Sequence, residues 1–235
     1  MDAWQVLTPF GAALAAYLVG SLSFAVIVSR LMGLADPRTF GSKNPGATNV
    51  LRSGSKAAAV VTLLLDAGKG WLPVLLVRSY GEPYGMGAGT VALVAFCAFV
   101  GHLYPLYFRF KGGKGVATAL GVLIGLNAWL GLVALLVWVF MALVFRISSL
   151  ASMTSALITP LAYLMGDGGL WESSRPVGAA VVAMCLLLMY RHAGNINRLV
   201  KGTEPRLGKK SAAPGAAAAQ AQGKAGGKGP SAHGH

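Results

Sequence analysis

The feature that most constrains this chain is an uncharged run at 116–145, bounded by Lys114 and Arg146. As one α-helix rising about 1.5 Å per residue, the run would be about 45 Å long. The hydrocarbon core of a bilayer is only about 30 Å thick. A single helix would therefore have to tilt severely, whereas two short helices joined by a tight turn would fit.

Five further apolar runs indicate a polytopic membrane protein. They are apolar on every side rather than amphipathic, and the whole chain is 55% hydrophobic with only 11% charged residues. The first run has neither a basic leader nor a small-residue cleavage site, so we expect it to remain as an anchor. Besides 116–145, the predicted spans are 10–29, 57–77, 85–108, 147–165 and 176–190.

Charge distribution favours two helices in the long run. With a turn near 125–129, all 20 Lys and Arg residues except Lys69, Arg78 and Arg175 fall on one side of the membrane. Short loops rich in Lys and Arg face the cytoplasm. The sequence therefore predicts an all-α protein with seven transmembrane helices, the amino terminus outside and the carboxyl terminus in the cytoplasm. Arg175 and Arg191 are expected to snorkel at the ends of the short last span.

The chain divides at about residue 208. Residues 1–208 are predicted to form the membrane domain, and the basic Ala- and Gly-rich segment 209–235 has no large apolar side chain with which to build a core. We expect this tail to be disordered and to lie against anionic headgroups. Cys97 and Cys185 fall inside apolar runs without metal-ligand spacing, so we expect packing roles for them and no metal site.

Four polar stretches lie between the spans, and the predicted topology puts all of them on the cytoplasmic face. Each combines glycine, hydroxyl or amide side chains with cations, which is the chemistry of anion binding. In KGGKG, glycine N–H groups and the start of a helix lie beside two ammonium groups, so a phosphate is the expected ligand. The stretches are FGSKNPGATNVLR (40–52), GHLYPLYFRFKGGKGVATALG (101–121), RISSLAS (146–152) and HAGNINRLVKGTEPRLG (192–208).

These motifs resemble those of the bacterial acyl-phosphate:glycerol-3-phosphate acyltransferases, the PlsY family, over residues 10–208. The similarity is close in GSKNPGATNVLR, in GH..P....FKGGKGVAT..G and in H..NI.RL..G.E...G. It implies an enzyme of the bacterial cytoplasmic (inner) membrane, with its active site facing the cytoplasm, that works in phospholipid synthesis without a cofactor.

The reaction implied by the resemblance moves a long-chain acyl group from acyl phosphate to the primary hydroxyl of sn-glycerol 3-phosphate. The products are 1-acylglycerol 3-phosphate (lysophosphatidate) and phosphate, and an acyl-phosphate-forming enzyme would supply the donor. A mixed anhydride is already activated, so such an enzyme needs positioning and charge stabilisation more than a strong nucleophile.

The resemblance also implies site residues. The first motif would hold a phosphate in the planar fork of Arg52, and the second would bind glycerol 3-phosphate. Glu204 is expected to hold its loop through an ion pair. The expected catalytic residues are Ser42, Arg52, Lys111, Ser149, His192 and Asn195. The expected substrate-binding residues are Lys43, Asn44, Gly46, Thr48, Asn49, Gly112, Gly113, Lys114 and Gly115.

Three assignments stay open at the level of sequence. His192 could accept the hydroxyl proton, or a substrate phosphate oxygen could do so with His192 orienting that phosphate; we favour the second. Asp66 and Lys69 lie three residues apart on one helical face and either neutralise each other or contact substrate. His102 is expected to pack or to anchor the loop that follows it.

Three other functions fit the sequence less well. An acyl-CoA-dependent acyltransferase would carry a His-x4-Asp pair, but Tyr107 and Asn197 stand where its aspartate should be. A carrier would place polar or broken helices at the midplane, where only Asp66 and Lys69 lie. A nucleic-acid binder would need a recognition module, and the predicted topology accounts for most of the basic charge behind the net +13.

Overall fold

The long uncharged run folds as two helices that meet at Asn127. In the computed structural model, which describes residues 3–208, α6 spans Val116–Leu126 and α7 spans Ala128–Phe145. Asn127 caps α7, because its Oδ1 accepts hydrogen bonds from the N–H groups of Trp129 (2.8 Å) and Leu130 (3.3 Å). The break therefore lies within the turn predicted at 125–129. The predicted tail, 209–235, lies outside the described residues.

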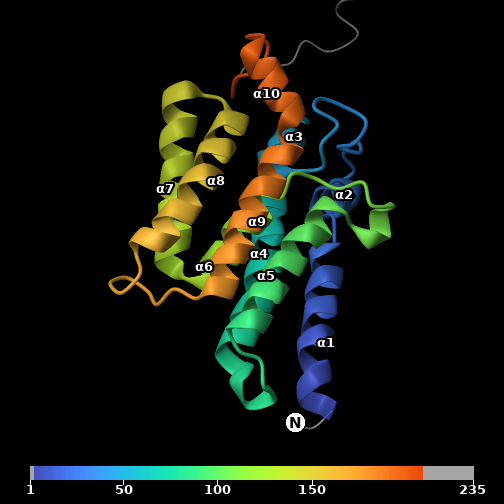
Figure 1. Cartoon of the computed structure of the whole chain (residues 1–235). Coiled ribbons are helices and arrows are strands. Elements are labelled where there is room, and N and C mark those ends of the chain that lie inside the picture. Colours follow the sequence, from blue (N-terminus) through green and yellow to red (C-terminus); the bar gives the residue numbers. More distant parts are fainter. Residues whose placement is uncertain (1–2, 209–235) are drawn as a thin grey trace, which may run out of the picture.

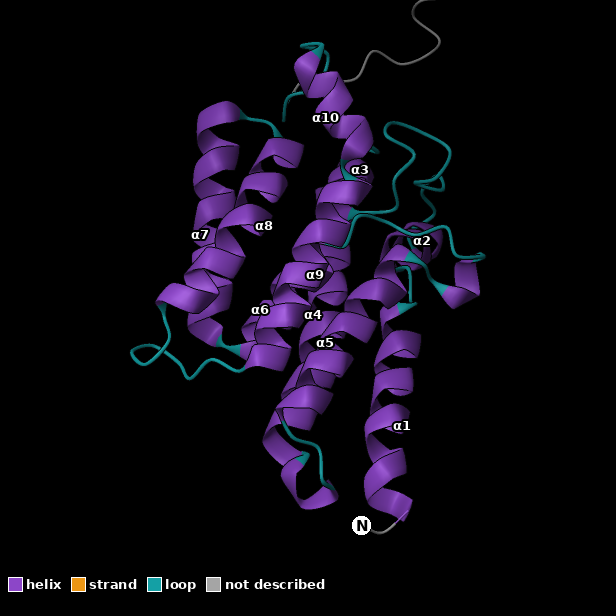
Figure 2. Ribbon diagram, in the orientation of Figure 1, coloured by secondary structure: helices purple, strands orange, loops and turns teal. Residues whose placement is uncertain are grey.

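The other regular elements of the described chain are also helices, joined by loops (Figures 1 and 2). Short 3-10 turns occur at Glu82–Tyr84 and Leu106–Phe108, and an isolated bridge joins Asp167 to Trp171. The other α-helices are α1 (Ala3–Gly20), α2 (Phe24–Leu31), α3 (Ala47–Leu51), α4 (Lys56–Tyr80), α5 (Ala88–Leu103), α8 (Ser148–Met165), α9 (Arg175–Arg191) and α10 (Ala193–Val200).

The first predicted span, 10–29, is not one straight helix. α1 and α2 are separated at residues 21–23 and are bent by 43°. A helix end leaves backbone carbonyls without helical partners. Here the Leu22 carbonyl accepts a hydrogen bond from the ammonium group of Lys69 on α4. The break is thus stabilised by a charged side chain from a neighbouring helix.

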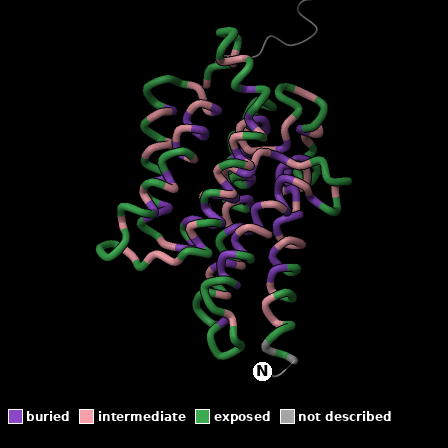
Figure 3. The backbone as a smooth tube through the Cα atoms, viewed as in Figure 1, coloured by how far each residue is buried: buried purple, intermediate pink, exposed green. Residues whose placement is uncertain are grey.

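Among the described residues, three helical segments are long and apolar enough to cross a membrane: α4, Ala88–Phe108 and α7. Within residues 3–208, counting the bent pairs α1/α2 and α9/α10 as single spans raises the number to five. α7 presents Leu136, Phe140 and Leu143 outward, and its outer surface is exposed along much of its length (Figure 3). Large apolar side chains facing outward suit a lipid environment.

The position of the start of α6 is fixed by its close packing against α4. α4 packs against α6, α1 against α5, and α7 against α8. A Cβ added at Gly70 of α4 would overlap the Thr118 carbonyl oxygen, and one added at Gly121 of α6 would overlap the Ala67 carbonyl oxygen. Small residues at a crossing let two backbones touch. α4 therefore holds α6 at backbone contact, directly after the glycine-rich stretch.

The polar loops gather towards one end of the bundle. In Figures 1 and 2, α3, α10 and the loops at 32–46 and 104–115 lie towards the end opposite the start of α1. The interior below them is apolar and well packed, with Phe99, Leu103 and Leu130 fully buried. Polar chemistry is thereby concentrated at one end and an apolar helix bundle forms the rest.

Candidate active site

A cavity of about 1310 Å³ opens among the polar loops and continues between the helices. Three regions contribute residues to its polar part: the loop before α3, Lys114 at the end of the glycine-rich stretch, and α10 with the segment that follows it. Its apolar part is lined by side chains of α4, α6, α7, α8 and α9, such as Leu63, Leu123, Leu135 and Met184. A molecule with an anionic head and an apolar chain would match both parts of this cavity.

Most of the predicted site residues line this cavity, although they come from distant parts of the chain. Lys56, Arg198 and Arg206 line it as well and were not among the predicted site residues. The predicted residues in the lining are Ser42, Lys43, Asn44, Gly46, Thr48, Asn49, Arg52, Lys114, Gly115, Ser149, His192 and Asn195.

Three predicted residues lie elsewhere. Lys111 is exposed and lines a separate hollow of about 420 Å³ with Arg38, Tyr107, Phe108 and Arg109. Gly112 and Gly113 precede Lys114 but are absent from the cavity lining, because they pack on the end of α5. The structure thus separates the two lysines of KGGKG, with Lys114 in the cavity and Lys111 outside it.

Asn49 organises the loop before α3. Its Nδ2 donates to the carbonyl oxygens of Pro37 (2.7 Å) and Phe40 (3.2 Å), and its Oδ1 accepts from the Ser42 N–H (3.0 Å). Only 2% of the residue is exposed. Although Asn49 was predicted to bind substrate, its polar atoms are occupied in holding the loop that presents Ser42.

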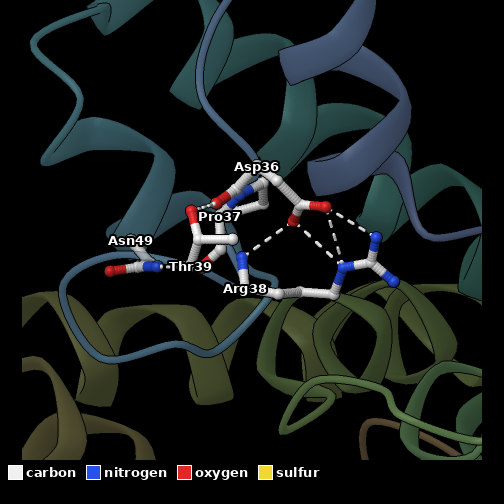
Figure 4. Close-up of polar contacts among 5 residues, drawn as sticks. All are labelled: Asp36, Pro37, Arg38, Thr39 and Asn49. Atoms are coloured by element: carbon white, nitrogen blue, oxygen red, sulfur yellow. Dashed lines mark hydrogen bonds and ion pairs between the residues drawn. The ribbon is translucent and has the colours of Figure 1, made fainter.

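A second contact fixes the same loop from its other side. Figure 4 shows the Arg38 guanidinium paired with the Asp36 carboxylate, at 2.6 Å between Nη2 and Oδ2. The same guanidinium lies over the ring of Phe108, 5.9 Å from its centroid. Because Phe108 belongs to the loop after α5, Arg38 links the segment just before the first polar stretch to the second polar stretch.

The polar part of the cavity is built around Glu204. Its Oε1 accepts hydrogen bonds from Ser149 Oγ (2.6 Å) and from Asn195 Nδ2, and its Oε2 accepts from Arg198 Nε (2.7 Å). The ion pair expected of Glu204 is therefore confirmed, with Arg198 as the partner. Burial acts to raise the pKa of Glu204, but these three hydrogen bonds outweigh it and the pKa is lowered.

Lys114 joins this network from the second motif. Its Nζ donates to Asn195 Oδ1, and Asn195 Nδ2 donates to Glu204, so the side-chain amide of Asn195 connects Lys114 to Glu204. Burial lowers the pKa of Lys114 to about 8, and the nearby Glu204 carboxylate only partly opposes this effect. Lys114 is consequently a cation inside the cavity that has lost much of its hydration and favours an anionic ligand.

His192 is held in one orientation at the end of α9. Its Nδ1 lies 2.8 Å from the Leu188 carbonyl oxygen, and only 2% of the residue is exposed. A carbonyl oxygen only accepts, so Nδ1 carries a proton and donates. In the neutral ring, Nε2 is then left with a free lone pair. A neutral His192 can accept a proton at Nε2, whereas donating there would require the doubly protonated ring.

A buried charge pair lies beneath the glycine-rich stretch. Lys69 Nζ is 2.8 Å from Asp66 Oδ1, which confirms that the two residues pair. His102 Nδ1 is 3.6 Å from the same oxygen and 3.1 Å from Thr118 Oγ1 of α6. The His102 carbonyl oxygen accepts from the Gly113 N–H at 3.2 Å, in agreement with the predicted anchoring of the next loop.

The described residues offer no candidate metal centre. Within 3–208, no three His, Cys, Asp or Glu side chains lie close enough together to hold a metal ion. The free thiols Cys97 and Cys185 lie on α5 and α9 and are partly buried. The polar groups that line the cavity are ammonium, guanidinium, hydroxyl, amide, imidazole and carboxylate groups.

Comparison with known proteins points to one family. A family model described as "Glycerol-3-phosphate acyltransferase" matches residues 10–202. A glycerol-3-phosphate acyltransferase of Albidiferax ferrireducens is 65% identical over 211 residues, covering 90% of this chain and 94% of the relative. One from Janthinobacterium sp. is 56% identical over 198 residues, covering 84% of this chain and 96% of the relative.

Solved structures agree with the sequence relatives. A crystal structure of PlsY, an integral membrane glycerol 3-phosphate acyltransferase, in its glycerol 3-phosphate form is 37% identical with a TM-score of 0.78. The lysophosphatidic acid form of PlsY is 36% identical with a TM-score of 0.76. Each alignment covers 86% of this chain and 96% of the solved chain.

Proposed function

The chain belongs to the glycerol-3-phosphate acyltransferase (PlsY) family, and on that premise we propose how its cavity performs the reaction. It is an integral membrane enzyme that acylates glycerol 3-phosphate to lysophosphatidic acid. The acyl donor is an acyl phosphate, and the acceptor is the primary hydroxyl of sn-glycerol 3-phosphate.

The observation that carries this proposal is the joining of a cationic end and an apolar groove in one cavity. Lys43, Arg52 and Lys114 line the cationic end, while α4 and α6–α9 supply the apolar walls. An acyl phosphate needs both environments, because its head is anionic and its chain is a hydrocarbon. Glycerol 3-phosphate needs only the polar end, where the two reactants would meet.

The transfer itself is an attack on a mixed anhydride. The primary hydroxyl oxygen of glycerol 3-phosphate attacks the acyl carbonyl carbon, the bond from that carbon to the phosphate oxygen breaks, and inorganic phosphate leaves. Lys114 and Arg52 neutralise charge on the two phosphates, and Ser149 and Asn195 hold the surrounding network. Ser42 donates a hydrogen bond to the donor phosphate.

The hydroxyl proton has two possible acceptors. One is a phosphate oxygen of the substrate, and the other is Nε2 of His192, whose lone pair is free when Nδ1 donates to Leu188. Because a neutral His192 lacks a donor at Nε2, it orients a phosphate only when doubly protonated. Replacing His192 by Gln removes the titrating group. Loss of the acidic limb of the kcat/KM profile would identify His192 as the base.

We further propose seven membrane-crossing segments, with the amino terminus outside and the cavity mouth facing the cytoplasm. These segments are α1/α2, α4, α5, α6, α7, α8 and α9, and the arrangement puts most Lys and Arg residues on the cytoplasmic side. Single cysteines at Glu82 and Leu106, in a chain without Cys97 and Cys185, test it. An impermeant thiol reagent should label the first in intact cells and the second only after permeabilisation.

The donor is tested with purified protein in lipid. Glycerol 3-phosphate is offered with acyl phosphate, acyl-CoA or acyl carrier protein thioester in parallel, and lysophosphatidic acid is measured. Turnover with acyl phosphate alone is expected. Turnover with acyl-CoA but not acyl phosphate would overturn the donor assignment, and uptake of glycerol 3-phosphate into vesicles without turnover would instead favour a carrier.

A further inference from the structure

Arg191, the last residue of α9, holds the glycine-rich stretch from 78 residues away. Its Nε donates to the Gly113 carbonyl oxygen at 3.1 Å, and its Nη2 donates to the Gly112 carbonyl oxygen at 2.9 Å. The guanidinium also lies over the ring of Tyr104, 5.6 Å from its centroid. The side chain is therefore not free to extend to the membrane surface, as snorkelling would require.

These bonds fix two successive peptide groups. In a trans peptide the C=O and N–H point in opposite directions. The Gly112–Gly113 peptide is bonded on both sides, since its carbonyl accepts from Arg191 and its N–H donates to the His102 carbonyl oxygen. The Gly113 carbonyl also accepts from Arg191, which turns the N–H of Lys114 away from the guanidinium.

The stretch would be costly to order without such contacts. Gly112, Gly113 and Gly115 stand within four residues, and glycine loses more conformational freedom on ordering than other residues. A Cβ at Gly113 would overlap His102 Nε2, and one at Gly112 would overlap the His102 carbonyl oxygen. The glycines are thus required for seating on α5, and a separate group has to hold them there.

We propose that Arg191 is a positioning residue that clamps the Gly112–Gly113 carbonyls and so presets the ammonium group of Lys114 for the phosphate of glycerol 3-phosphate. This inference rests on the proposed function, since it assigns Lys114 to that substrate. Arg191 itself does not line the cavity, whereas its neighbours in sequence and space, His192 and Lys114, both do.

Carbonyl groups suit this clamp because they leave the guanidinium charge in place. A carboxylate partner would hold Arg191 equally well but would neutralise it, and a negative group near Lys114 would weaken anion binding. The positive charge of Arg191 instead adds to the field at Lys114, and it contributes to the lowered pKa of that residue after burial and the nearer charges. Arg191 therefore orders the glycine-rich stretch and also makes the electrostatic potential near Lys114 more favourable for an anion.

The kinetic test compares Arg191→Ala, Arg191→Gln and Arg191→Lys with Arg175→Ala. Arg175 begins the same helix at its other end and carries the same charge, so it controls for loss of one arginine from α9. We expect Arg191→Ala to raise the KM for glycerol 3-phosphate by roughly tenfold, equivalent to about 1.4 kcal/mol. The KM for acyl phosphate should change little. Arg191→Lys can still reach one carbonyl, so its KM for glycerol 3-phosphate should lie between those of the wild type and Arg191→Ala.

Hydrogen exchange of peptides covering 109–118 supplies a readout that does not depend on turnover. Arg191→Ala and, to a smaller extent, Arg191→Lys should exchange faster there than the wild type, while Arg175→Ala should not. The inference would be overturned if Arg191→Lys and Arg191→Gln both showed the wild-type exchange rate and the wild-type KM for glycerol 3-phosphate. This comparison remains decisive even if Arg191→Ala does not fold. A wild-type enzyme inactive with acyl phosphate, but with faster exchange in the variants, would refute the proposed function and retain the clamp.

Discussion

Ser149 Oγ donates a 2.6 Å hydrogen bond to Oε1 of Glu204, across 55 residues of sequence. The bond joins the start of α8 to the segment that follows α10, and Arg146 strengthens the same connection. The Arg146 carbonyl oxygen accepts from the Leu207 N–H at 2.6 Å, and Arg146 Nη2 donates to the Leu207 carbonyl oxygen at 3.3 Å. The last part of the described chain is therefore fastened over the wall formed by α7 and α8.

Replacing Glu204 by Gln should weaken this fastening. The carboxylate now accepts three hydrogen bonds, including one from Arg198. A hydrogen bond to a charged group contributes about 1.5–3 kcal/mol to the free energy of unfolding. The thermal midpoint of unfolding in detergent should therefore fall by roughly 3–10 °C. Ser149→Ala, which removes one neutral donor, should cost less. Equal midpoints for wild type and Glu204→Gln would show that the network does not stabilise the fold.

The same carboxylate gives the stability a defined dependence on pH. Because the folded-state pKa of Glu204 is lowered, its contribution is fully present above the unfolded value of about 4.3 and is lost as pH falls through the folded pKa. The difference in midpoint between wild type and Glu204→Gln should therefore shrink on acidification below about pH 4. A difference that grows in acid would contradict the sign of this shift.

Lys114 should set the alkaline limit of substrate capture. Its pKa is lowered to about 8, so the ammonium form prevails below that value and is lost above it. The kcat/KM for glycerol 3-phosphate, which reports the free enzyme, should fall as pH rises through about 8. Lys114→Arg retains its charge at high pH. If this variant is active, its kcat/KM should no longer fall as pH rises through about 8. An unchanged limb in Lys114→Arg would assign it to another group.

Breaking the Asp66–Lys69 pair by removing one partner should destabilise the protein more than removing both partners. Both residues are at most 4% exposed, so Lys69→Met leaves an uncompensated buried carboxylate and should cost about 3–5 kcal/mol. The double variant Asp66→Asn with Lys69→Met removes both charges and should recover part of that loss, but the Leu22 carbonyl still loses its Lys69 donor. Midpoints and yields of the two single variants and the double variant form a cycle. A double variant less stable than either single one would argue against simple charge compensation.

Gly70 and Gly68 provide a matched pair on α4. A Cβ at Gly70 would overlap the Thr118 carbonyl oxygen of α6, whereas one at Gly68 would meet nothing within 4 Å. Gly70→Ala should push α6 away, cost about 1–3 kcal/mol and reduce glycerol 3-phosphate affinity through Lys114. Gly68→Ala should be neutral or slightly stabilising, because alanine favours a helix. Similar stability and KM in both variants would show that the α4–α6 contact can relax.

Sequence reasoning located the helix break because its cause is local, whereas the residues predicted for the cavity lining came from the resemblance of their motifs to a known family. An uncharged run too long for one span, together with the placement of the Lys and Arg residues, predicts a turn at 125–129, and the structure has it at Asn127. The clamp on Gly112 and Gly113 has no local cause, since Arg191 looked like any cation at a helix end. Likewise Lys111 and Lys114 are alike in sequence, and only the packing of the glycines on α5 places them on different sides of the loop.

The unequal hairpin has a consequence for where the two substrates meet. α6 has 11 residues and α7 has 18, and both start from Asn127. If the two helices run antiparallel across the membrane, as in the proposed topology, at about 1.5 Å per residue α6 stops roughly 10 Å short of the level that α7 reaches. In that arrangement Lys114, which precedes α6, would lie deeper in the membrane than the end of α7. A water-borne phosphate ester would then have to descend towards the lipid-borne donor, and the thickness of the surrounding bilayer would become a variable of the reaction.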